Sequence, residues 1–199
     1  WAKTYEVGVV SDLAYGALGY QGYENPSFLS TPGAKDVGIE FYTFSKTFNM
    51  AGWRLAFSAG NDQMIEALNL IQDHLFVGIF PALQEAGIAA LLDPKSEEAV
   101  AQLNATYDSR RDAFVQAAAK IGWQAFPSRG SFYAWMPVPE GYTSESFADL
   151  LLEKAHVAVA PGKGFGPAGD AYVRIGLLVE PERLVEAVNR IANLHLFNN

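Results

Sequence analysis

The chain has 199 residues, of which 50% are hydrophobic and 18% charged, so it is long enough and apolar enough to bury a sizeable core. Its formal net charge of −8 weighs against nucleic acid or an anionic membrane as the main partner, because both attract basic surfaces. It contains no cysteine, which excludes disulfides and thiolate metal sites. The histidines His74, His156 and His195 lack metal-ligand spacing, so we expect no metal site.

The beginning of the chain and its apolar runs give expectations about location. The first residues, WAKTYEVGVV, lack the charged region and long apolar run of a secretory signal. No apolar stretch reaches the roughly 20 residues that span a bilayer. We therefore expect a cytoplasmic protein that does not bind a membrane. The apolar run at 7–10 has no complete unit before it, so we also expect the chain to begin within a domain.

Short apolar runs, separated by helical patterns, predict an alternation of strands and helices. Several runs are apolar nearly throughout, which is typical of parallel strands covered on both faces. The predicted strands are 7–10, 39–44, 54–59, 132–138, 157–160 and 172–178.

The helical patterns predict five helices and one domain boundary. Asn61 and Asp62 form a capping pair at the start of the first helix, and Gly122 ends the longest one. The segment LLDPKSEE contains Pro94, which prevents a helix from continuing there. We therefore predict an α/β part over 1–93 and a smaller α+β part over 94–199. The predicted helices are 61–75, 81–92, 96–121, 144–155 and 181–196, of which 96–121 joins the two parts.

Two ionisable residues follow predicted strands. Asp12 comes after the run VGVV, and Lys46 comes after the run IEFYTF. Ligands of open α/β sheets bind at the carboxyl ends of strands, so both side chains are placed to face one crevice. The alternative for Asp12 is a cap of the next turn. Lys46 lies in the largely apolar stretch TFSKTFNMAGWRLAF, where an ammonium must be paired or neutral.

Three segments carry a resemblance to a known family. Residues 45–57, SKTFNMAGWRLAF, resemble the lysine signature of the class I/II aminotransferases, which are fold-type I enzymes dependent on pyridoxal 5'-phosphate. The segment DLAY at 12–15 resembles that family's D-x-[AE]-Y element, and YVRIG at 172–176 resembles its late substrate-binding arginine. The resemblance covers essentially the whole chain but matches only the C-terminal half of the family.

The resemblance implies a fold and a domain assignment. Residues 1–93 would be the last part of the cofactor-binding large domain, which has a mostly parallel sheet with helices on both faces. Residues 94–199 would be the small C-terminal domain. The family's remaining cofactor contacts lie in its N-terminal half, which we do not find in this sequence.

The resemblance also implies roles for the residues around the cofactor ring. Lys46 would form the Schiff base with pyridoxal 5'-phosphate and then act as the general base and acid that moves the substrate's proton. Asp12 would pair with the pyridine nitrogen and keep it protonated, which improves the ring as an electron sink. Tyr15 would hydrogen-bond the phenolic oxygen and lower the pKa of the Schiff base.

Further roles concern the phosphate and the substrate. By resemblance, Arg54 would pair with the phosphate through its planar fork. Thr43 stands where the family usually has a phosphate-contacting serine, and Ser45 would assist. Arg174 would hold the α-carboxylate of the substrate.

The function implied by the resemblance is transamination between an α-amino acid and a 2-oxo acid, by a protein that forms a homodimer. We expect the isolated chain to have little or no activity because half of the pocket is missing. Two alternatives stay open, a lyase or synthase on the same fold and a non-catalytic aminotransferase-like module. The sequence does not select a particular amino acid.

A glycine-rich segment resembles a different kind of site. Residues 164–169, GFGPAG, fit the pattern G-x-G-x-x-G. A strand and not a helix is predicted to follow, so no helix N-terminus is available for a pyrophosphate, and we reject a dinucleotide site.

Overall fold

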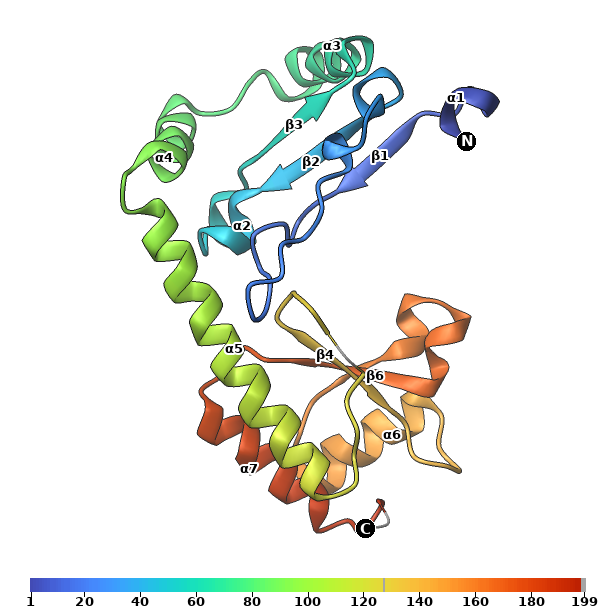
Figure 1. The fold of residues 1–199 in the computed structure, drawn as a ribbon. Helices are drawn as coiled ribbons and strands as arrows, with labels where there is room; N and C mark the ends of the chain where they lie inside the picture. Colours follow the sequence, from blue (N-terminus) through green and yellow to red (C-terminus); the bar gives the residue numbers. More distant parts are fainter. Residues whose placement is uncertain (127, 198–199) are drawn as a thin grey trace. The chain divides into compact units, whose positions relative to one another are not determined.

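The computed structural model describes residues 1–126 and 128–197, which form two compact units, Trp1–Leu103 and Asn104–Asn199 (Figure 1). Helix α5, Ser96–Lys120, runs through the division between them. The assignment of 1–93 and 94–199 to a large and a small domain stays a prediction.

The first unit is built on a three-stranded sheet in the order β1-β2-β3 (Figure 1). Strands β1 and β2 are parallel, with Asp12 opposite Phe41, as the apolar runs predicted. Strands β2 and β3 are antiparallel, with Thr43 opposite Ala56, so the sheet that we expected to be mostly parallel is mixed. The reason is the connection 44–55, which folds into two short helices and returns at the same edge, whereas a parallel return needs a crossover along the sheet.

The helices of the first unit start and end close to the predicted positions. The side chain of Asn61 accepts a hydrogen bond from Met64 N at 3.1 Å, which is the predicted cap of α3. The predicted helix 61–75 is α-helical only to Ile71 and then continues as the π-helical turn η4. The elements are α1 Ala2–Tyr5, β1 Val9–Asp12, η1 Phe28–Ser30, η2 Ala34–Asp36, β2 Gly38–Thr43, α2 Phe44–Thr47, η3 Ala51–Trp53, β3 Ala56–Gly60, α3 Asp62–Ile71, η4 Gln72–Phe76 and α4 Pro81–Leu92.

The second unit has a three-stranded antiparallel sheet in the order β4-β6-β5, covered by helices. The predicted strand 157–160 is reduced to Ala160–Pro161, because only this part pairs with β6. The α/β class predicted for the chain is confirmed, with a mixed sheet in one unit and an antiparallel sheet in the other. The elements after α5 are β4 Tyr133–Pro137, α6 Ser144–Leu150, η5 Leu151–Ala155, β5 Ala160–Pro161, η6 Gly162–Phe165, η7 Pro167–Ala171, β6 Tyr172–Gly176 and α7 Pro181–Ala192.

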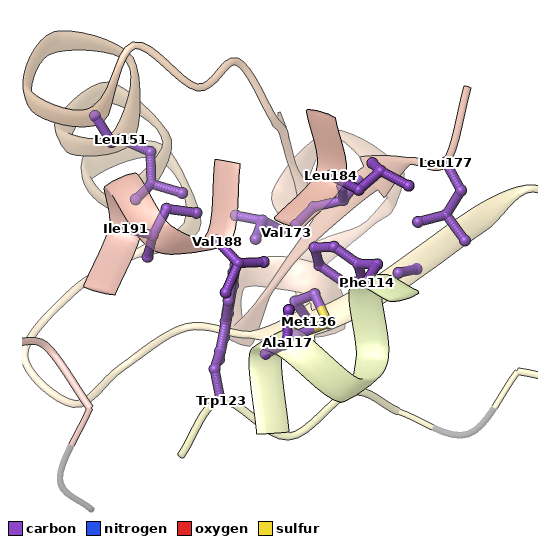
Figure 2. Packing of buried hydrophobic residues seen from close by; sticks show 14 of the residues in the cluster. Phe114, Ala117, Trp123, Met136, Leu151, Val173, Leu177, Leu184, Val188 and Ile191 are labelled. Atoms are coloured by element: carbon purple, nitrogen blue, oxygen red, sulfur yellow. The ribbon is translucent and has the colours of Figure 1, made fainter. Parts of the chain in front are cut away.

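The core of the second unit includes Trp123, which is 1% exposed and lies at one side of the cluster in Figure 2. Its indole Nε1 donates to the carbonyl of Pro137 at 2.7 Å, so the only polar atom of the ring is satisfied. Phe114 and Phe147 pack edge-on against the indole. Helix α7 adds Leu184, Val188 and Ile191, which recur at helical spacing on one face.

Two kinds of site are absent from the described part of the chain. Over residues 1–126 and 128–197, no helix combines the length and the hydropathy that a membrane crossing requires. The same residues contain no group of three or more histidine, cysteine, aspartate or glutamate side chains arranged to hold a metal ion.

Candidate active site

The candidate site begins where β2 passes into the short helix α2. The hydroxyl of Thr43 accepts a hydrogen bond from Ser45 N at 3.1 Å, which ends the strand and starts the helix. The hydroxyls of Thr43 and Ser45 lie 2.9 Å apart. Lys46 follows on the same helical turn, so it stands just beyond the strand end and not on the strand itself.

Lys46 and Tyr15 are brought together although they are far apart in the sequence. The Nζ atom of Lys46 lies 5.9 Å from the centroid of the Tyr15 ring. This distance is within the range of a cation–π contact. Both side chains are partly buried, so a molecule that reached Lys46 would also meet Tyr15.

Asp12 occupies the same edge of the sheet. It is the last residue of β1, is exposed, and lies opposite Phe41 of the parallel strand β2. The neighbouring Leu13 N donates to Phe41 O at 2.9 Å and fixes the point at which the chain leaves the sheet. Because parallel strands end at one edge, the chain segments of Asp12 and Lys46 both leave the sheet there.

Arg54 precedes β3 in an unusual backbone conformation. Its φ of 53° lies in the left-handed region, which is sterically costly for a residue with a Cβ atom. The Nη1 atom donates to Ala51 O at 2.9 Å and the side chain is exposed. In the described residues Arg54 forms no ion pair with a carboxylate, so its charge remains available to an anion.

Leu55, the residue after Arg54, contacts the segment that carries the hydroxyls of Thr43 and Ser45. The carbonyl of Leu55 accepts from Phe44 N at 3.2 Å and lies 3.4 Å from the hydroxyl of Thr43. The structure therefore brings two hydroxyls, a guanidinium and an amine to one end of the sheet in the first unit.

The loop between β1 and β2 is attached to the sheet by a buried carboxylate of β2, Glu40, which sequence reasoning missed. Glu40 of β2 is only 7% exposed and accepts hydrogen bonds from Ser11 Oγ at 3.0 Å, Ser27 Oγ at 2.6 Å and Phe28 N at 2.7 Å. These bonds satisfy a buried carboxylate and attach the returning loop to the sheet. One acidic residue within an apolar strand is the sequence signal that could have identified it.

Arg174 belongs to the second unit, where it lies at the middle of β6. Its guanidinium carbon is 4.1 Å from the centroid of the Tyr133 ring and 4.3 Å from that of Phe165. Two aromatic rings therefore hold the planar group, while its forked donors remain suited to a carboxylate.

These residue types fit pyridoxal 5'-phosphate. An amine beside a phenol suits its aldehyde and phenolic oxygen, and an exposed carboxylate suits a basic ring nitrogen. The hydroxyls of Thr43 and Ser45 and the guanidinium of Arg54 are donors of the kind that bind phosphate. The specific role of each residue remains a proposal.

Comparison with known proteins places this arrangement in a family. The model of the family "Aminotransferase class I and II" matches residues 1–191, so the chain belongs to this family. The chain spans about half the length of the curated relatives it matches, with 47% of one and 48% of another covered.

The relatives are named as aminotransferases. An L-glutamine–4-(methylsulfanyl)-2-oxobutanoate aminotransferase of Bacillus subtilis is 59% identical over 95% of this chain and 47% of its own length. An LL-diaminopimelate aminotransferase of Moorella thermoacetica is 46% identical over 96% of this chain and 48% of its own. Substrate-bound BacF of B. subtilis superposes with a TM-score of 0.92 at 44% identity, covering 98% of this chain and 50% of that one.

Proposed function

We propose that the protein is a pyridoxal 5'-phosphate-dependent aminotransferase that transfers an amino group from an α-amino acid to a 2-oxo acid. The observation that carries the proposal is Lys46 Nζ at 5.9 Å from the Tyr15 ring, on the short helix α2 that begins next to the hydroxyls of Thr43 and Ser45. Membership of the aminotransferase family and the names of the relatives support it.

The cofactor and the protein residues have different chemical roles. When bound, pyridoxal 5'-phosphate supplies an aldehyde that condenses with amines and a ring that accepts the electrons of a carbanion. Lys46 would hold the aldehyde carbon through Nζ and, as general base and acid, would move the proton of the substrate's Cα. Tyr15 would donate a hydrogen bond to the phenolic oxygen, and Asp12 would pair with the protonated ring nitrogen.

The remaining residues orient the two ligands. Arg54 neutralises the phosphate while Thr43 and Ser45 donate hydrogen bonds to it. Arg174 binds the α-carboxylate, a group that all α-amino acids share, so it fixes the orientation of the substrate without selecting its side chain. The rings of Tyr133 and Phe165 support this orientation.

The two alternative functions predict different products. A lyase would break a bond of the substrate side chain or release ammonia, whereas an aminotransferase conserves the amino group. A non-catalytic module would bind the cofactor without turnover. The names of the relatives favour transfer over both.

The test is to follow an isotopically labelled amino group in the protein expressed from its intact gene. Glutamine and 4-(methylsulfanyl)-2-oxobutanoate are the first pair to assay, because they name the relative at 59% identity. We expect the label in the new amino acid, loss of turnover in Lys46→Ala and full turnover in Lys35→Ala, which changes an exposed lysine of η2. Release of labelled ammonia would support the lyase instead.

The proposal includes two further properties that come from the family resemblance alone. We infer a homodimer, in which the other half of the pocket would be completed, and a location in the cytoplasm. Sedimentation of the protein and fractionation of the cells that make it test these two properties separately.

A further inference from the structure

We propose that Asn25 is a positioning residue that holds Tyr15 in place beneath Lys46. Its side-chain Nδ2 donates to the carbonyl of Tyr15 at 3.1 Å, of Gly16 at 3.3 Å and of Leu18 at 3.1 Å. One side-chain amide therefore donates hydrogen bonds to three carbonyl oxygens of the turn that carries the Tyr15 ring. The inference rests on the proposed function, in which Tyr15 contacts the cofactor.

Backbone hydrogen bonds and the Asn25 side chain act together on this turn. Gly16 N donates to Leu13 O at 3.1 Å, and Leu18 N donates to Tyr15 O at 2.9 Å. The turn contains no regular helix or strand, so these bonds and those of Asn25 help to set its conformation. Loss of the amide would remove one donor from each of three carbonyls and would loosen the turn that carries the Tyr15 ring.

The two residues that follow Asn25 restrict its position. Pro26 follows it and restricts its backbone to extended conformations. Ser27 Oγ then donates to the buried carboxylate of Glu40 on β2 at 2.6 Å. A chain of contacts therefore runs from the sheet through Asn25 to Tyr15.

The loop before Asn25 has one close backbone approach. A Cβ atom at Gly19 would lie 1.6 Å from the carbonyl oxygen of Tyr23 and 3.8 Å from Asn25 Nδ2. A side chain at position 19 would therefore disturb the loop next to Asn25.

The test replaces Asn25 with aspartate, which has the same shape but no N–H donors and places negative charge against three carbonyls. Asn69→Asp, on the exposed surface of α3, is the matched control for the added charge. Both variants are made in the protein expressed from its intact gene, each with Tyr15 and with Tyr15→Phe. The first readout is the pH midpoint of the visible absorbance change of the bound cofactor.

We expect Asn25→Asp to move this midpoint to higher pH by at least half the shift that Tyr15→Phe causes. In the Tyr15→Phe background the same change should have no further effect, because Asn25 acts through Tyr15. The second readout is hydrogen exchange of the Leu18 amide, which should become about tenfold faster in Asn25→Asp and stay unchanged in Asn69→Asp.

The outcomes separate this inference from the proposed function. An absorbance band in the unaltered protein with equal midpoints in Asn25→Asp and Asn69→Asp would overturn the role of Asn25 while leaving the cofactor site intact. A midpoint shift that persists in the Tyr15→Phe background would also overturn it, because Asn25 would then act by another route. A complete lack of the band in the unaltered protein would reject the proposed function first, and the positioning role with it.

Discussion

Two substitutions of Arg54 separate the cost of its backbone conformation from the contribution of its guanidinium to cofactor binding. With its φ of 53°, a residue that has a Cβ atom carries about 1–2 kcal/mol of strain. Arg54→Ala removes the guanidinium and keeps this strain, whereas Arg54→Gly removes both. Glycine adds about 0.5–1 kcal/mol of chain entropy to the unfolded state, so the glycine variant should be more stable than the alanine variant by about 1 kcal/mol.

Affinity for pyridoxal 5'-phosphate should respond in another way. A charge-assisted hydrogen bond contributes about 1.5–3 kcal/mol, so both variants should bind the cofactor about tenfold to 150-fold more weakly. Equilibrium unfolding of the apo-protein measures the first quantity, and titration with the cofactor measures the second. Unchanged affinity in both variants would refute the phosphate role of Arg54, and equal stability of the two would refute the strain argument.

Three further predictions concern stability and pH. Glu40→Ala should destabilise the protein by about 3 kcal/mol in a urea titration, because it leaves the Ser27 hydroxyl and the Phe28 N–H without their buried acceptor. Glu40→Gln keeps one acceptor oxygen and should destabilise the protein less. Trp123→Phe should cost about 1–3 kcal/mol by the same measurement, since Pro137 O loses its donor and a small cavity forms, and a neutral result would show that the indole bond is dispensable. The pKa of Asp170 is lowered because Ser144 donates hydrogen bonds to its carboxylate through the hydroxyl and the backbone N–H. The stability that this carboxylate contributes is therefore present above the usual aspartate pKa and is lost as pH falls through the lowered value. In acid melts Asp170→Asn should lose this part of the pH dependence and Asp149→Asn should keep it.

Local sequence signals predicted the helices of this chain well. The Asn61 cap of α3 and the end of α5 before Gly122 each depend on residues of one element, so they can be identified without knowledge of neighbours. Strand orientation was harder, because β3 is antiparallel to β2 for a reason that lies in the fold of the connection and not in the strands. The predicted strand 157–160 is mostly unpaired because a strand needs a partner as well as apolar residues.

The candidate site shows the same division. The ordered motifs identified Lys46, Asp12 and Arg54 as chemistry-bearing residues, but no pattern in the sequence indicated Asn25. An asparagine in an irregular loop has no periodicity, and its importance appears only when three carbonyls converge on it. Glu40 was predictable in principle, as an acid in an apolar strand whose burial demands partners.

The most direct test of the account is to find where pyridoxal 5'-phosphate attaches. The protein expressed from its intact gene is mixed with the cofactor, reduced with borohydride, digested and mapped by mass spectrometry. The account predicts one modified lysine, Lys46, with labelling retained in Lys35→Ala and lost in Lys46→Ala. Labelling of another lysine, or no labelling that depends on Lys46, would contradict it.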